Sequence, residues 1–200
     1  IYSSRIFKHK YLMDLDKNCE NLFNDLKVKW IQTNQFGIDL NHRKRFKWAY
    51  NWNKFIQSDE KSYKFNCKFI NINNNFDFKD VKTNKINAKL IQRGGRDKAI
   101  KLLDSFIETR SENYQREMSS PVSGEIACSR LSPHITYGTI SLKEIHRKIS
   151  DKLKKVCTIN KRKSLMAFKN RLAWHCHFIQ KLYDEPCLLY TSDAADDIPG

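Results

Sequence analysis

Long apolar runs and paired cysteines are both missing from this chain. No uninterrupted apolar stretch approaches the roughly 20 residues of a membrane-spanning helix, and none follows a charged N-terminus as in a signal peptide. The six cysteines are scattered without a Cys-x-x-Cys pair, so we expect free thiols and no disulfide framework or zinc site. The sequence therefore predicts a soluble, cytoplasmic globular protein with no membrane partner, and a monomer is expected.

One short stretch, His175-Cys176-His177, has the residue types of a metal site. It lies in a segment with helical spacing, where consecutive side chains point about 100° apart and cannot converge on one ion. We therefore expect no metal.

Acidic residues are few relative to basic ones, and the formal net charge is +15. Such an excess favours an anionic partner, with nucleic acid as the first candidate. The abundance of Asn and Ile beside Lys is also typical of an A+T-rich coding sequence, in which case the basic residues form solvated faces. Composition leaves both interpretations open.

The first part of the chain has the pattern of an α/β layer. Apolar spacing of three and four predicts a helix over 12–26, a short strand is expected over 28–32, and spaced aromatic residues predict another helix over 46–55. No partner strand is evident. The asparagine-rich segment 56–92 lacks periodicity and is interpreted as a long interdomain connection.

Helical periodicity returns after Gly94-Gly95 and predicts a helix that ends near Tyr114, followed by a Ser, Pro and Gly-rich loop over 119–127. A last helix is expected over 162–183. Its predicted apolar stripe is Leu165, Phe168, Leu172, Cys176 and Ile179.

The segment 128–141, "CSRLSPHITYGTIS", lies between these helices. Ser129 and Ser132 stand where a short helix begins, with Pro133 in its first turn and Gly138 at its end. Ser141 begins the next helix and forms a capping box with Glu144. The predicted buried face of that helix is Leu142, Ile145, Ile149, Leu153 and Val156.

Two uses of the serine-rich turn remain open from the residues alone. A helix N-terminus flanked by hydroxyl groups can bind an anion, commonly a phosphate. Ordinary capping of the helix by Ser explains the same residues without a ligand.

Three separate motifs carry a family resemblance. They are "GGRDKAIKLLDSFIETRSENYQ" at 94–115, "ACSRLSPHITYGTISLKEIH" at 127–146 and "FKNRLAWHCHFIQKL" at 168–182. In this order and spacing they resemble the start of the flavin-binding domain of the photolyase and cryptochrome family. The segment from Trp30 onward is similar to the end of that family's α/β antenna domain, so the resemblance covers most of residues 12–186.

The resemblance implies a fold, a cofactor and a partner. The expected fold is mostly α, the N-terminal part of an all-helical FAD-binding domain preceded by a remnant of an α/β Rossmann-like domain. Light-driven repair of pyrimidine lesions in DNA by bound FAD is the implied activity. The residues implied to lie against the FAD phosphates and ribitol are Tyr114, Ser129, Arg130, Leu131 and Ser132.

Phe168 falls where the family has an aromatic residue beside the flavin, and Trp174 matches the tryptophan that stacks on a flipped dimer. Packing in the core is the alternative for both. Arg171 stands where dimer-repairing members have a glutamate, and arginine cannot accept hydrogen bonds from thymine. A light-signalling cryptochrome without repair activity is therefore one alternative function, and a flavin-free basic nucleic-acid-binding domain is another.

The expected organisation is an antenna-domain remnant at 1–55, an interdomain linker at 56–92 and half of an FAD-binding domain at 93–186. The last residues, 187–200, "CLLYTSDAADDIPG", contain no Lys or Asn and resemble a translated sequencing adapter, so we exclude them from the fold. This fragment lacks the family's catalytic residues. We expect it to be inactive alone and to bind FAD weakly or not at all, and the antenna chromophore stays unknown.

Overall fold

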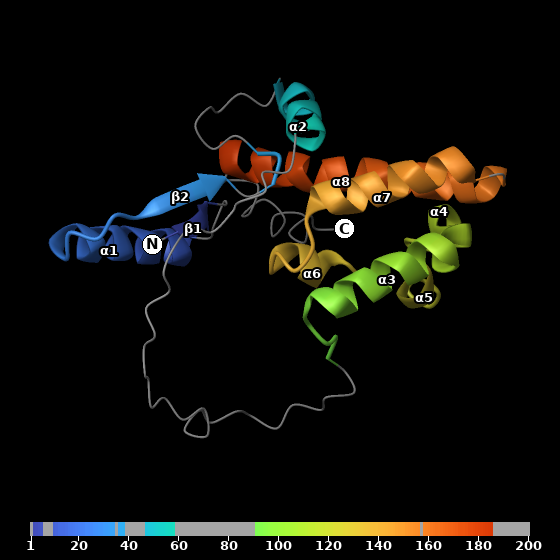
Figure 1. Ribbon diagram of the computed structural model, residues 1–200, viewed down its shortest axis with the longest axis horizontal. Coiled ribbons are helices and arrows are strands. Elements are labelled where there is room, and N and C mark those ends of the chain that lie inside the picture. Colours follow the sequence, from blue (N-terminus) through green and yellow to red (C-terminus); the bar gives the residue numbers. More distant parts are fainter. Residues whose placement is uncertain are drawn as a thin grey trace, which may run out of the picture.

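The computed structural model describes residues 2–5, 10–34, 36–38, 47–58, 91–156 and 158–185, and this part of the chain is mostly helical (Figure 1). The N-terminal elements are β1 (Tyr2–Arg5), α1 (Lys10–Asp25), β2 (Ile31–Asn34) and α2 (Trp48–Gln57). The remaining elements are α3 (Arg96–Glu108), η3 (Arg110–Asn113), α4 (Tyr114–Glu117), α5 (Gly124–Ala127), α6 (Ser132–Thr136), α7 (Leu142–Lys155) and α8 (Ile159–Asp184).

The two strands form a small parallel sheet, with Tyr2 paired to Ile31 and Arg5 paired to Asn34. Parallel strands need a crossover, and α1 supplies it. The helix predicted over 12–26 is therefore confirmed, and the strand predicted over 28–32 begins three residues later. The expectation of no partner strand was wrong, because the sequence "YSSR" of β1 carries too little apolar alternation to signal a strand.

The helical elements pack around α8, which runs along α7 and crosses below α2 in Figure 1. The helices share one core of buried side chains. Its fully buried members include Leu103, Phe106, Leu131, Ile140, Ile145, Ile149 and Leu165. The periodic stripes predicted for the last two helices are confirmed at these positions, although Leu153, Val156 and Ile179 are only partly buried.

The helix predicted to reach Tyr114 breaks earlier. α3 ends at Glu108, and the chain continues as the 3-10 helix η3 and the short α4. The break follows from Arg110, whose side chain turns back to the Leu102 carbonyl at 2.8 Å instead of continuing along the helix. The loop predicted over 119–127 also contains one helical turn, α5.

The start of α7 confirms the predicted cap. The Ser141 Oγ accepts a hydrogen bond from the Glu144 N–H at 3.1 Å. The Glu144 carboxylate accepts hydrogen bonds from the Arg96 guanidinium at 2.9 Å and 3.1 Å. α8 begins at Ile159, three residues before the predicted start.

Some predictions lie outside the described residues. These are most of the linker predicted over 56–92, the side chain of Phe46 and the adapter-like tail. In the described part of the chain, no helix has the length and apolar character needed to cross a bilayer.

Candidate functional site

Arg110 anchors the turn that leads from α5 to α6. Its guanidinium donates to the carbonyl oxygens of Cys128 and Leu102 and, at 3.4 Å, to that of Ser129. It also donates to the Ser105 Oγ at 3.0 Å. An arginine presents five donors in one plane, so a single side chain can hold backbone groups from two distant segments. Arg110 therefore fixes the position of the serine-rich turn relative to α3.

The next feature is the backbone of Arg130, which has a φ of 60°. This left-handed conformation, uncommon for a residue with a Cβ, turns the chain into α6. The Arg130 guanidinium pairs with Glu125 at 2.9 Å, and its carbonyl oxygen accepts from the Gln92 side chain at 2.7 Å. Burial lowers the pKa of Arg110, and the nearby Arg130 charge lowers it further. The positive charges of Arg110 and Arg130 therefore act on one another at this turn.

The serines of the turn do not cap α6. Leu131 occupies the N-cap position and no side chain donates or accepts a capping hydrogen bond there. Ser129 is buried and its Oγ accepts from the Leu131 N–H at 3.4 Å, whereas Ser132 is exposed. The prediction that Ser129 and Ser132 stand where this helix begins is confirmed, because α6 starts at Ser132, although neither hydroxyl caps it. Pro133 does lie in the first turn.

Tyr114 and Phe168 meet in an aromatic cluster with Phe106. The ring centroids of Tyr114 and Phe168 are 5.5 Å apart, and each ring also contacts Phe106, at 5.4 Å and 4.6 Å. Both are almost fully buried, at 5% and 6% exposure. The Arg110 guanidinium lies 5.7 Å from the Phe106 ring centroid, so the cluster and the serine-rich turn are neighbours. Phe168 is thus packed in the core, which is the alternative to a position beside the flavin that the sequence left open.

Electrostatics connect α8 to this cluster. Burial raises the pKa of Tyr114, and the positive charge of Arg171 opposes that rise. Arg171 itself is exposed, and one turn further along α8 the Trp174 ring is 55% exposed. Trp174 contacts Phe178 edge-on at 5.8 Å. The predicted stripe of Phe168, Arg171 and Trp174 therefore runs from the core to the surface, and Trp174 is not a core residue.

The His175-Cys176-His177 stretch binds the N-terminal segment. His175 packs edge-on against Phe36 at 4.8 Å, and the Cys176 Sγ accepts from the Gly37 N–H at 3.4 Å. His177 packs on Trp48 at 4.6 Å. Burial lowers the pKa of His175 and raises that of Cys176 to about 12. The three side chains diverge onto separate partners, and no metal-ligand cluster occurs in the described ranges.

Arg110 is the site residue that sequence reasoning missed. It was counted as part of the apolar spacing of Ala99, Leu103 and Phe106. A charged residue within the apolar spacing was the available signal, because a partly buried arginine requires several hydrogen-bond acceptors.

Similarity to a known protein covers one part of the chain. No protein-family model matches it. A stretch of 82 residues, 41% of this chain, is 33% identical to the deoxyribodipyrimidine photo-lyase of Halobacterium salinarum. That stretch is only 17% of the relative, so the chain spans a small part of its length. This distant and partial similarity favours a relationship to the photolyase and cryptochrome family.

Proposed function

We propose that this chain is part of a blue-light FAD flavoprotein of the photolyase and cryptochrome family. One observation carries the proposal. Arg110 holds the Cys128–Ser129 turn beside the Tyr114–Phe168 cluster, so segments implied separately to contact FAD are neighbours in space. The partial similarity to a deoxyribodipyrimidine photo-lyase supports the same assignment.

The chemistry of the turn suits a diphosphate. Arg110 and Arg130 lie close enough for their like charges to interact, and an anion between them would relieve that repulsion. The exposed Ser132 hydroxyl is not used by α6 and can donate to a phosphate oxygen. The Ser129, Arg130 and Ser132 groups would hold the FAD phosphates. Phe168, at 6% exposure, would offer only its edge to a bound ring.

Exposed residues of α8 would contact the damaged DNA. Bound FAD supplies light-driven electron transfer, while the protein supplies binding, orientation and electrostatics. The exposed ring of Trp174 can stack on a base taken out of the duplex. Arg171 can donate hydrogen bonds to a phosphate or to a carbonyl oxygen of the base, and it has no acceptor for thymine N–H groups.

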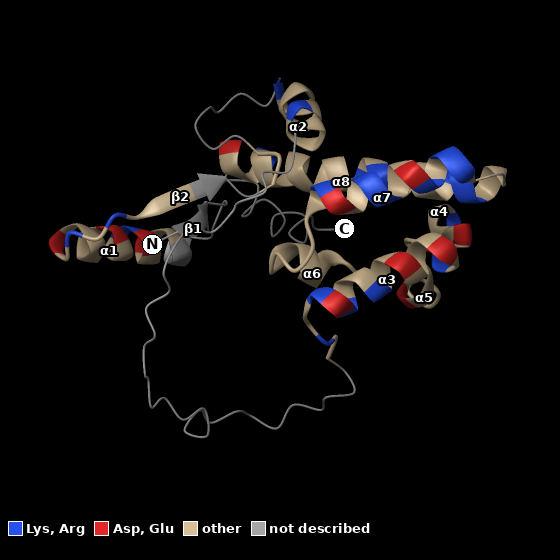
Figure 2. Cartoon of the chain, viewed as in Figure 1, with Lys and Arg blue, Asp and Glu red and all other residues tan. Residues whose placement is uncertain are grey.

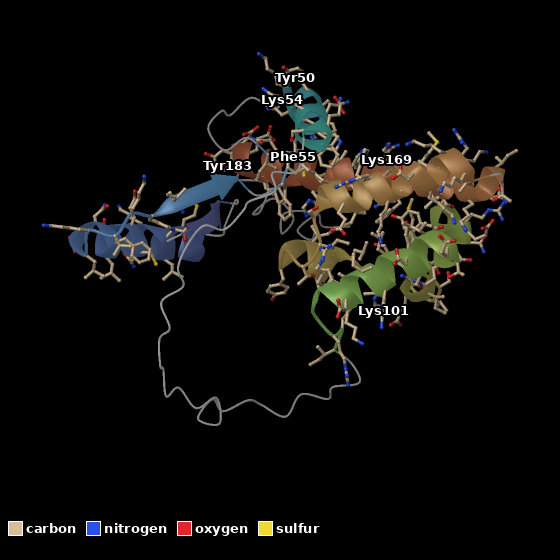
Figure 3. The ribbon with its side chains drawn as sticks, in the orientation of Figure 1. Tyr50, Lys54, Phe55, Lys101, Lys169 and Tyr183 are labelled. Atoms are coloured by element: carbon tan, nitrogen blue, oxygen red, sulfur yellow. The ribbon has the colours of Figure 1, made fainter. Side chains whose placement is uncertain are left out.

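Flavin binding tests the proposal. A longer protein containing this chain is expected to retain FAD through gel filtration, with absorbance near roughly 450 nm. We expect Arg110→Met to lose the flavin, because the turn loses its anchor. Lys101→Met is the matched control. Lys101 is exposed on α3 (Figure 3), and its substitution removes the same charge as Arg110→Met.

Ser132→Ala is a second test that does not depend on the folding of the Arg110 variant. It removes an exposed hydroxyl without a structural role in α6 and is expected to weaken FAD binding about tenfold, the size of one hydrogen bond to a charged group. A wild-type protein that never binds flavin, but binds oligonucleotides, would contradict the proposal and favour a flavin-free nucleic-acid-binding domain.

Arg171 favours one second candidate, a cryptochrome that signals without repairing DNA. Its exposed guanidinium stands at the position where the resemblance predicts a hydrogen-bond acceptor. Blue-light-dependent loss of cyclobutane dimers from irradiated DNA would exclude this candidate. Flavin photoreduction without loss of dimers or other pyrimidine lesions would support it.

A further inference from the structure

A polar pocket lies between the end of α2 and one face of α7. Its volume is about 380 Å³. Its polar lining consists mainly of Ser58, Lys143, His146, Arg147, Ser150 and Lys154. None of these residues belongs to the serine-rich turn or to the Tyr114–Phe168 cluster, so the pocket is independent of the proposed flavin site.

The two faces of α7 differ in how their positive charges are balanced. On the face toward α3, Lys148 pairs with Asp104 at 2.8 Å and Lys152 pairs with Glu108. Acidic and basic segments, red and blue, alternate along α3 and α7 in Figure 2. Basic side chains on that face therefore have acidic partners on the neighbouring helix.

The residues that line the pocket include more basic than acidic side chains. The sequence of α2, "WAYNWNKFIQ", contains no acidic residue. Asp151 is the one carboxylate among the residues that line the pocket, and it binds Lys154 at 2.9 Å. Lys143, Arg147 and Lys154 thus give the lining a net positive charge.

Several of these groups are held in place. The Lys143 ammonium donates to the Ser58 carbonyl and hydroxyl oxygens at 3.0 Å and 2.7 Å. It also lies 5.0 Å from the centroid of the Phe55 ring, which Figure 3 labels at the base of α2. Burial and the charge of Lys169 lower the pKa of His146 to about 4, so His146 is a neutral hydrogen-bonding group at pH 7.

We propose that this pocket binds a phosphate group. Its volume is at the lower end of the roughly 300–1,000 Å³ of small-molecule sites, and its lining combines cations with hydroxyl donors. The phosphate has two possible sources, a free phosphorylated compound or the backbone of a nucleic acid, and one set of variants distinguishes them.

The experiment uses the 200-residue chain and two probes, inorganic pyrophosphate and a single-stranded oligothymidylate, in calorimetric titrations at low salt. The pocket variant is Arg147→Gln with Lys154→Gln, both exposed residues. The matched control is Lys148→Gln with Lys152→Gln, which removes the same charge from the same helix on its balanced face. Circular dichroism checks that all three proteins are folded.

Saturable pyrophosphate binding that weakens at least about tenfold in the pocket variant, and less than about twofold in the control, supports the proposal with a free phosphate as the source. The same pattern with the oligonucleotide alone supports a backbone phosphate. Binding of neither probe overturns the proposal. Equal weakening in both variants also overturns it, because net charge alone would then explain the binding.

Discussion

Two helices of this chain, α7 and α1, have comparable apolar spacing but differ in the burial of their apolar side chains. In α7, Leu142, Ile145 and Ile149 are buried against α8 and α3. In α1 and directly after it, Met13, Leu22 and Leu26 are all more than half exposed. Phe23 does contact Trp30 edge-on at 5.4 Å, just before β2. Apolar periodicity therefore predicts that a helix forms and which face is apolar, but burial depends on a partner element elsewhere in the chain.

The largest expected difference between the helical core and α1 comes from truncating one apolar side chain in each. Phe106→Ala should lower the free energy of unfolding by about 3–5 kcal/mol, because it empties the centre of the aromatic cluster. Leu22→Ala should change it by less than about 0.5 kcal/mol, since this side chain is 53% exposed. Denaturant titration measures both. A comparable loss from Leu22→Ala would mean that α1 is buried in solution.

The contact that the segment before α2 makes with α8 can be broken at Gly37. A Cβ there would lie 2.9 Å from ring atoms of both Phe55 and Trp52, so Gly37→Ala should cost about 1–3 kcal/mol and loosen the segment from Cys176. Hydrogen exchange in α2 should rise. Gly94→Ala is the control, because no heavy atom lies within 4 Å of its added Cβ. Unchanged exchange in α2 would show that Gly37 does not hold this segment.

A smaller effect is expected from capping within the helical part. Ser141→Ala should cost about 1 kcal/mol, since the Glu144 N–H loses its acceptor. Ser132→Ala should leave the melting temperature nearly unchanged, because its side chain makes no capping hydrogen bond. Thermal unfolding distinguishes the two serines. Equal shifts would place a cap at both helix starts.

The last prediction concerns the dependence of stability on acid pH. The pKa of His146 is lowered to about 4 in the folded protein by burial and by Lys169, from an ordinary value of 6.5. The unfolded state therefore binds the proton first, and the free energy of unfolding should fall as the pH drops from about 6.5 towards 4. His146→Gln should flatten part of this fall, while His175, whose pKa burial also lowers, keeps the rest. An unchanged pH profile in His146→Gln would mean that this imidazole is accessible to solvent.

Local patterns predicted much of the helical part. The buried positions of α7 and α8 followed from apolar spacing, and the Ser141 cap followed from its distance to Glu144. Each depends on residues within one or two turns, which a sequence displays directly. The roles of Tyr114, Ser129, Arg130, Leu131, Ser132, Phe168, Arg171 and Trp174 came from the resemblance and remain predictions.

Other features could not be predicted because their causes lie far apart in the chain. α3 ends early because Arg110 binds carbonyl oxygens at 102, 128 and 129. β1 forms because β2, 29 positions away in register, offers it a parallel edge. The place of Arg110 within the apolar spacing is visible in the sequence, but its partners at 128 and 129 and the pairing of β1 with β2 are not.

By itself the sequence determined where the longer helices lie, which face of each is apolar and how strongly basic the chain is. Tertiary structure decided which polar groups meet: Arg110 with the Ser129 turn, three consecutive residues of α8 with Phe36, Gly37 and Trp48, and Lys148 of α7 with Asp104 of α3. Helical hydrogen bonds and apolar periodicity act over a few residues, whereas hydrogen bonds and charge pairs between elements exist only once packing brings distant segments together.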